Sequence, residues 1–163
     1  MPTSLWLQVV QALAGRVMNL PGYRHPLSDD AGIGVYILQE LEQHEDPTAG
    51  DWVCVGWTGT PDDRTAPGAV AQRTATLGNR ARDESGEIAV RVCAQTGDAD
   101  PQTATGRAMA RLADIERAIR DDPTLGVPSR RMVAEVTAAA FLPADAAGSV
   151  CQIDITVAYT ARI

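Results

Sequence analysis

The chain has 163 residues, a length that fits one domain able to bury roughly two thirds of its unfolded surface without disulfides or a metal. Its formal net charge is −7 and all 14 basic residues are arginines. Binding to nucleic acid through clustered positive charge is therefore not the expected task, and a lysine-containing phosphate loop is excluded. Because 45% of the residues are hydrophobic but only 4% aromatic, we expect one domain over residues 1–163 with an aliphatic core.

The first predicted element is an amphipathic helix near the N terminus. Its apolar positions recur at helical spacing, at Leu5, Val9, Leu13 and Val17. Thr3 or Ser4 can cap its start by accepting a backbone hydrogen bond, and the prolines and glycines after Asn19 end it. Polar residues interrupt the segment and no basic leader precedes it, so we expect neither a signal peptide nor a membrane span, and synthesis in the cytoplasm.

The middle of the chain alternates between predicted strands and loops. Residues 32–41 (GIGVYILQEL) indicate a short strand, residues 42–50 an acidic turn, and residues 51–59 (DWVCVGWTG) a second strand. Residues 59–79 show little regular pattern, so we expect a long, mobile loop that faces a partner. In residues 86–95 (GEIAVRVCAQ), Ile88, Val90, Val92 and Ala94 alternate with Glu87, Arg91 and Gln95, which predicts a strand with one covered face.

A second helix and a terminal hairpin complete the predicted order. Asp100 followed by Pro101 is typical of a helix start, and residues 108, 112, 115 and 119 form one apolar stripe up to about Arg120. Residues 130–144 fit a helix or a strand by propensity, but the alternating segment 148–163 after them favours a strand and an antiparallel hairpin. The expected fold is α+β: an antiparallel sheet of about four to five strands with two main helices packed on one face.

Few residues suggest chemistry. Cys54, Cys93 and Cys151 lie in apolar strands without a CxxC pair, which indicates buried free thiols. The acid pairs Asp62–Asp63 and Asp121–Asp122 flank prolines, where aspartate is typical of turns. His25 and His44 lack the spacing of a metal site. We therefore expect no catalytic residues, no cofactor and no metal.

One charged cluster stands apart, formed by Arg80, Arg82, Asp83 and Glu84 just before the predicted strand 86–95. It can be interpreted as a binding or catalytic cluster, as a polar surface that contacts another subunit, or as a solvated loop. The residues alone leave these interpretations open.

Several segments taken in order resemble a known protein family. The segments are DWVCVGWTGTPDD, LGNRARDESGEIAVRVCAQTGDAD, a helix ending in IERAIRDDPTLG, and CQIDITVAYTARI. Together, over about residues 50–163, they resemble the tail terminator or minor tail proteins of long-tailed phages and related prophages. The resemblance implies a sheet backed by helices and a non-enzymatic virion protein.

The resemblance also implies partners and a location. Such a subunit forms a hexameric ring on the head-proximal end of the tail, stops growth of the tail-tube protein, and meets the head-tail connector. DNA passes through without specific binding and no membrane is involved; assembly takes place in the bacterial cytoplasm. A closed ring uses a head-to-tail interface, and Arg80 and Arg82, next to Asp83 and Glu84, could face Asp121 or Asp122 of the adjacent subunit.

Two alternatives remain open at this stage. The first is another head-tail joining protein or a tail-tube subunit, from the same class of structural proteins. The second is a small acidic hydrolase that uses Asp62, Asp63 or a cysteine, which would need a pocket that gathers titratable groups.

Overall fold

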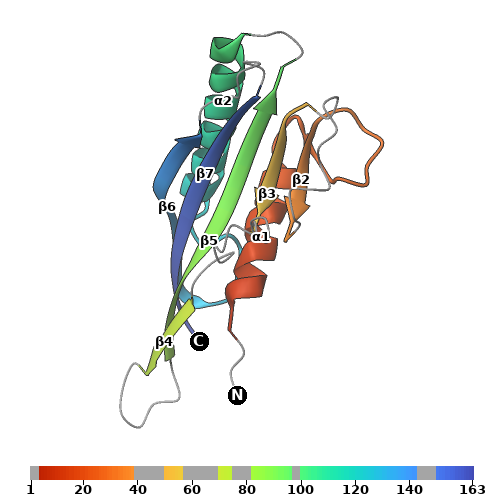
Figure 1. The fold of residues 1–163 in the computed structure, drawn as a ribbon. Coiled ribbons are helices and arrows are strands. Elements are labelled where there is room, and N and C mark those ends of the chain that lie inside the picture. Colours follow the sequence, from red (N-terminus) through yellow and green to blue (C-terminus); the bar gives the residue numbers. More distant parts are fainter. Residues whose placement is uncertain (1–3, 39–49, 57–69, 75–81, 97–99, 143–149) are drawn as a thin grey trace.

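A computed structural model describes residues 4–38, 50–56, 70–74, 82–96, 100–142 and 150–163 (Figure 1). The elements in chain order are α1 (Trp6–Met18), β1 (Tyr23–Arg24), β2 (Ile33–Ile37), β3 (Trp52–Val55), β4 (Val70–Thr74), β5 (Arg82–Gln95), α2 (Pro101–Asp121), β6 (Arg130–Leu142) and β7 (Val150–Arg162). The predicted α+β class with two helices is confirmed. The acidic turn at residues 42–49 lies outside the described residues.

The sheet is mixed, and this corrects the expectation of a purely antiparallel sheet of four to five strands. Six strands follow one path in the order β1-β2-β3-β5-β7-β6, and β4 pairs with the part of β5 that β3 does not reach. β1, β2 and β3 run parallel to one another, whereas the other pairs are antiparallel. The connection from β2 to β3 exceeds a dozen residues, which is long enough for a crossover instead of a hairpin.

A strand inside the predicted long loop is the second correction. β4 occupies residues that were expected to be irregular, and it pairs with residues 82–86 of β5. β5 accordingly begins at Arg82, four residues earlier than predicted. The charged residues 82–84 therefore lie within a strand that has neighbours on both sides, β4 and β7, and not in a loop at its entrance.

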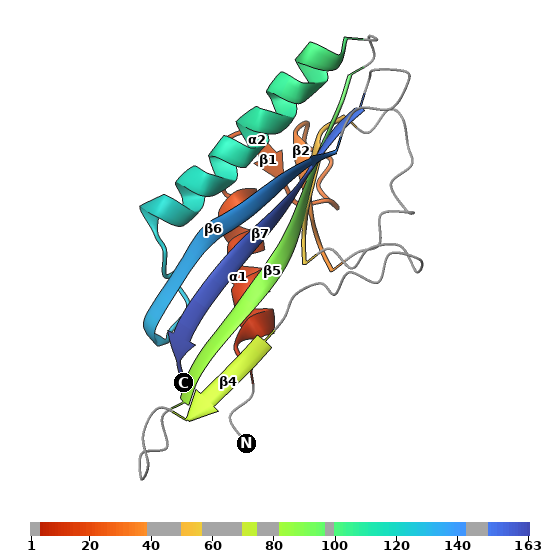
Figure 2. The same cartoon turned by 60° about the vertical axis from the view of Figure 1, so that its left-hand side comes forward.

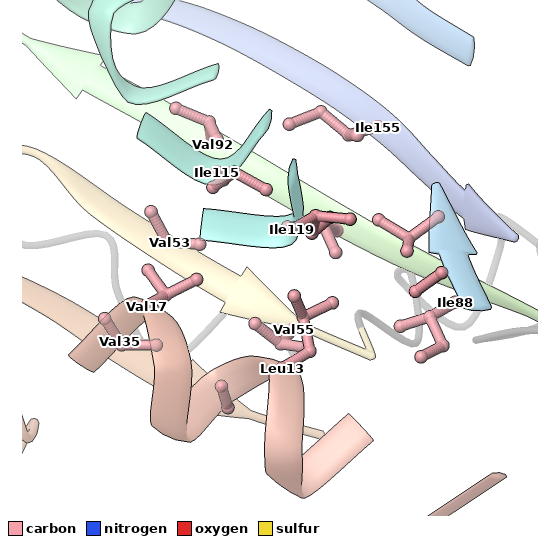
Figure 3. Close-up of a cluster of buried hydrophobic side chains, with 14 of the residues drawn as sticks. Leu13, Val17, Val35, Val53, Val55, Ile88, Val92, Ile115, Ile119 and Ile155 are labelled. Atoms are coloured by element: carbon pink, nitrogen blue, oxygen red, sulfur yellow. The ribbon is translucent and has the colours of Figure 1, made fainter. Parts of the chain in front are cut away.

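Both helices cover the same face of the sheet, as predicted (Figure 2). Val53 and Val55 of β3 and alternate residues of β5 and β7 point to this face, where the side chains of α1 and α2 meet them (Figure 3). The predicted stripe of α2 is buried at all four positions, Ala108, Leu112, Ile115 and Ile119. The core is largely aliphatic, as the composition indicated.

Side chains at the start of both helices accept backbone hydrogen bonds, as the sequence indicated. The Asp100 carboxylate accepts the Gln102 N–H at 3.0 Å, with Pro101 at the first helical position. At α1 the Ser4 hydroxyl accepts the Trp6 N–H at 3.1 Å, although Leu5 occupies the N-cap position. The terminal hairpin is also confirmed, with β6 antiparallel to β7.

Candidate functional site

The four residues of the charged cluster have different surroundings. Arg80 lies outside the described residues, and Arg82 is half-buried in β5. Asp83 accepts from the Arg162 guanidinium, with 2.8 Å between Oδ1 and Nε, in an exposed cross-strand pair. Glu84 is 1% exposed and points into the core. Within this cluster, Asp83 thus lies on the surface, whereas Glu84 is a buried structural residue.

Glu84 joins the start of α1 to the sheet. Its Oε1 accepts hydrogen bonds from the Tyr159 hydroxyl at 2.7 Å, the Leu5 backbone N–H at 2.9 Å and the Ser4 hydroxyl at 3.1 Å. A carboxylate at a helix N terminus satisfies N–H groups that have no partner within the helix and interacts favourably with the helix dipole. Burial raises the pKa of Tyr159, and its bond to Glu84 adds to the effect. Glu84 therefore fixes where α1 lies on the sheet.

Asp121 and Asp122, the acids expected on the opposite flank, lie at the end of α2. Asp121 is the last residue of the helix and is exposed. Asp122 accepts the Thr124 backbone N–H at 3.0 Å and pairs with Arg16 of α1. The hydrogen bond from the Thr124 hydroxyl is the main cause of a lowered Asp122 pKa. The turn interpretation holds for Asp122, and its pair with Arg16 also links the two helices.

A polar cluster that was not expected from the sequence lies between α2 and the β1–β3 part of the sheet. Asp51, whose side chain is 4% exposed, faces Arg107 at 2.7 Å and Arg111 at 3.7 Å. Asp114 accepts from the Tyr23 hydroxyl at 2.9 Å, and the Arg111 guanidinium lies 5.7 Å from the Tyr23 ring centre. Residues 107, 111 and 114 are three or four positions apart and are therefore neighbours on one face of a helix. This spacing could have indicated the part of the cluster that α2 contributes.

This polar cluster holds α2 to the sheet and is built from mutually compensating charges. Asp114 additionally pairs with Arg117 at 2.6 Å. Each carboxylate of the cluster faces two guanidinium groups, so the ion pairs hold α2 against this part of the sheet.

The three cysteines are buried free thiols, as predicted. Cys54 and Cys93 pack with Trp52 on the face of the sheet opposite the helices. Burial raises the pKa of the Cys93 thiol to about 12, and the nearby Asp51 carboxylate contributes to the shift. A thiol in this state is a poor nucleophile, because the thiolate is the reactive form.

We expect these thiols to be unreactive in the folded protein. A colorimetric thiol reagent should modify all three thiols rapidly in denaturant. In native buffer the reaction should be slower by a factor on the order of 100, because it requires opening of the core. A thiol that reacts equally fast in both conditions would contradict the buried positions.

The raised pKa values also predict loss of stability in alkali. Cys93, Tyr23 and Tyr159 all keep their protons in the folded state at pH values where the unfolded chain releases them. The stability that these three groups contribute is complete at pH values below their pKa values in the unfolded chain, and it falls as the pH rises above those values. Urea midpoints should be level up to about pH 8 and decline from about pH 9 upward. A midpoint independent of pH over this range would argue against these shifts, and Tyr23→Phe should remove part of the decline.

Among the described residues no group of three or more His, Cys, Asp or Glu side chains could hold a metal ion. Within that same part of the chain no helix is long and apolar enough to cross a membrane. A groove of about 490 Å³ between α2 and β6 is lined by Glu116, Arg120 and Glu135 together with apolar side chains. No histidine, cysteine or hydroxyl side chain contributes to its lining. Asp62 and Asp63 lie outside the described residues.

Comparisons with known proteins give no family assignment: no family model matches the chain, and no curated protein matches it.

Proposed function

We propose that this chain is a structural protein of a long phage tail, a tail terminator that forms a hexameric ring at the head-proximal end of the tube. The ordered motifs of residues 50–163 carry the proposal. In the fold these motifs correspond to β3, β5, α2 and β7, which form the centre of the sheet and the longer of the two covering helices. The proposal includes contacts with the tail-tube protein and the head-tail connector, and no catalytic step.

Charge supports the proposed path for DNA. A protein with a net charge of −7 attracts phosphate groups weakly, so a ring of six such subunits lets DNA pass without holding it. The arginines at residues 80 and 82 and the acid at residue 121 remain the proposed polar part of the ring interface, with Asp83 beside them. Glu84 and Asp122 are already bound within the same chain, by Tyr159 and Arg16 respectively, and contribute by holding the helices in place.

The test of the function is assembly. Light scattering coupled to size-exclusion chromatography, over a range of concentrations and with tail-tube protein of the same genome, should show a hexamer or its formation on tubes. Electron microscopy should show tubes that stop growing at a capped end. A protein that stays monomeric throughout and never stops tube growth would refute the proposal. Tubes formed by the purified chain alone would instead identify a tail-tube subunit.

The polar part of the interface gives a further prediction. The double variant Arg80→Ala/Arg82→Ala should keep its circular dichroism spectrum and melting temperature but associate roughly tenfold more weakly, since rim charges contribute modestly. Arg117→Ala is the control, because its exposed side chain pairs within α2. A double variant that loses its fold would show that these arginines serve the monomer.

A further inference from the structure

The outer edge of β6 is one of the free strand edges of the described fold. No described strand pairs with this edge, and residues 137–141 are all exposed. Their sequence, TAAAF, has no charge and no proline, two of the devices that prevent an edge from pairing with another chain, although a register shift between Val136 and Ala138 bends the start of the segment. Phe141 is 52% exposed. This half of the edge is therefore suited to contact with another protein.

The opposite edge of the same sheet carries a second apolar projection. Residues 25–27 follow β1, and Leu27 is 87% exposed, the highest value among the described large hydrophobic side chains. The Arg24 guanidinium donates to the carbonyl groups of Ser28 at 2.9 Å, Gly32 at 3.1 Å, and His25 and Pro26 at 3.3 Å each. These bonds direct the charge of Arg24 into the loop and order the loop around Leu27. A loop that is ordered in advance loses little entropy on binding.

The two projections lie at the same height on the sheet. One row of cross-strand neighbours runs through Val35, Val53, Val92, Ile153 and Phe141. At the β2 end of this row, Leu27 shares a hollow with Val35 and Tyr36. The row therefore has Leu27 beside one end and Phe141 at the other. β2 and β6, which carry the two ends, lie on opposite flanks of the sheet (Figure 1).

Strand direction also matches. β1 runs parallel to β3, which runs antiparallel to β5; β5 and β6 each run antiparallel to β7. β1 and β6 are consequently antiparallel to each other. A second copy placed beside the first in the same orientation brings its β1 edge antiparallel to the free edge of β6, one of the two relative directions in which strands pair.

We propose that copies of this chain associate head to tail, with the loop 25–27 of one copy seated against residues 137–141 of β6 in the next. The contact joins two different patches, so its repetition gives a ring where the rotation per copy closes on itself and an open filament where it does not. Pro26, Leu27 and the TAAAF segment are uncharged, and His25 of the same loop accepts the Leu27 N–H through Nδ1 at 3.1 Å. The contact between Leu27 and the TAAAF segment therefore brings no charged side chain against an apolar one. As the interface of the ring, this contact rests on the proposed function; as self-association, it is tested on its own.

Paired cysteine variants test the contact. Leu27→Cys and Phe141→Cys proteins are made separately, and the three native thiols stay buried in both. After mild oxidation, the mixture should give a disulfide-linked dimer on a non-reducing gel, with the 27–141 link identified by mass spectrometry, and neither variant alone should give it. A mixture of Leu27→Cys with Met109→Cys, an exposed site on α2, is the proximity control. No link in the first mixture, or equal linking in each variant alone, would overturn the proposal.

Association measurements provide the second test. Leu27→Ser and Phe141→Ser should each weaken self-association at least tenfold, whereas Leu7→Ser, which is 47% exposed on α1, should not. All three should melt within a few degrees of the parent protein, which separates an interface effect from misfolding. Unchanged association of the first two variants would overturn the proposal. Capped tubes without the 27–141 link would refute this interface alone, whereas the link without tube capping would refute the tail terminator and keep the interface.

Discussion

Glu84→Ala is expected to destabilise the folded protein by about 3 kcal/mol, because it opens a cavity and leaves buried donors unsatisfied. The Tyr159 hydroxyl and the Leu5 N–H both lose their acceptor, and α1 loses the carboxylate at its N terminus. For a chain of this length the melting temperature should fall by roughly 6–12 °C. Thermal and urea unfolding followed by circular dichroism would measure the change.

The control for Glu84→Ala is Glu87→Ala on the same strand, where the side chain is exposed and the expected change is within about 0.5 kcal/mol. Tyr159→Phe removes only one of the three bonds and should cost about 1 kcal/mol. If Glu84→Ala melted with the parent protein, Glu84 would have no role in placing α1.

Gly86→Ala is expected to cost about 2–3 kcal/mol, through overpacking against Tyr159. A Cβ atom at this position would lie 2.5 Å from the nearest ring carbon of Tyr159 and 2.7 Å from its hydroxyl oxygen. The ring cannot move aside freely, because it is 1% exposed and its hydroxyl is bound to Glu84. Gly86 and Tyr159 are direct cross-strand neighbours of β5 and β7. The strand therefore needs a glycine where the ring lies over its backbone.

Gly106→Ala is the matched control for this substitution. A Cβ atom at residue 106 meets nothing within 4 Å on the exposed side of α2, so the same change should stabilise the protein by about 0.5–1 kcal/mol. Opposite signs for the two variants would support the packing argument. Equal effects would indicate that Tyr159 adjusts at little cost.

Sequence patterns predicted the elements whose signals are local. The alternation of β7 and of the second half of β5, the apolar stripe of α2, and the Asp100–Pro101 helix start each depend on residues a few positions apart. The apolar residues next to each of the three cysteines likewise predicted thiols buried in strands. β4 was missed because VAQRT has neither a strong alternation nor many β-branched residues, and its pairing with β5 is what makes it a strand.

The candidate site was less predictable, because its contacts join distant parts of the chain. In the sequence, Glu84 is one of several consecutive charged residues. Its hydrogen-bond partners Ser4 and Tyr159 are 80 and 75 residues away along the chain. Asp51 and Arg107 are 56 residues apart, and neither shows its partner in the local sequence. No pattern within a few residues distinguishes a buried carboxylate with three donors from a solvated one.

Taken by itself, the sequence determined the class of the fold, the aliphatic core and the single face covered by both helices, because hydrophobic periodicity specifies which side of each element is buried. Only the tertiary structure decided that β1, β2 and β3 run parallel, that Glu84 is internal, and that Leu27 and Phe141 flank one row of the sheet. The physical reason is that strand order, direction and register are set by pairing between distant segments, and each segment's own pattern fits several pairings equally well.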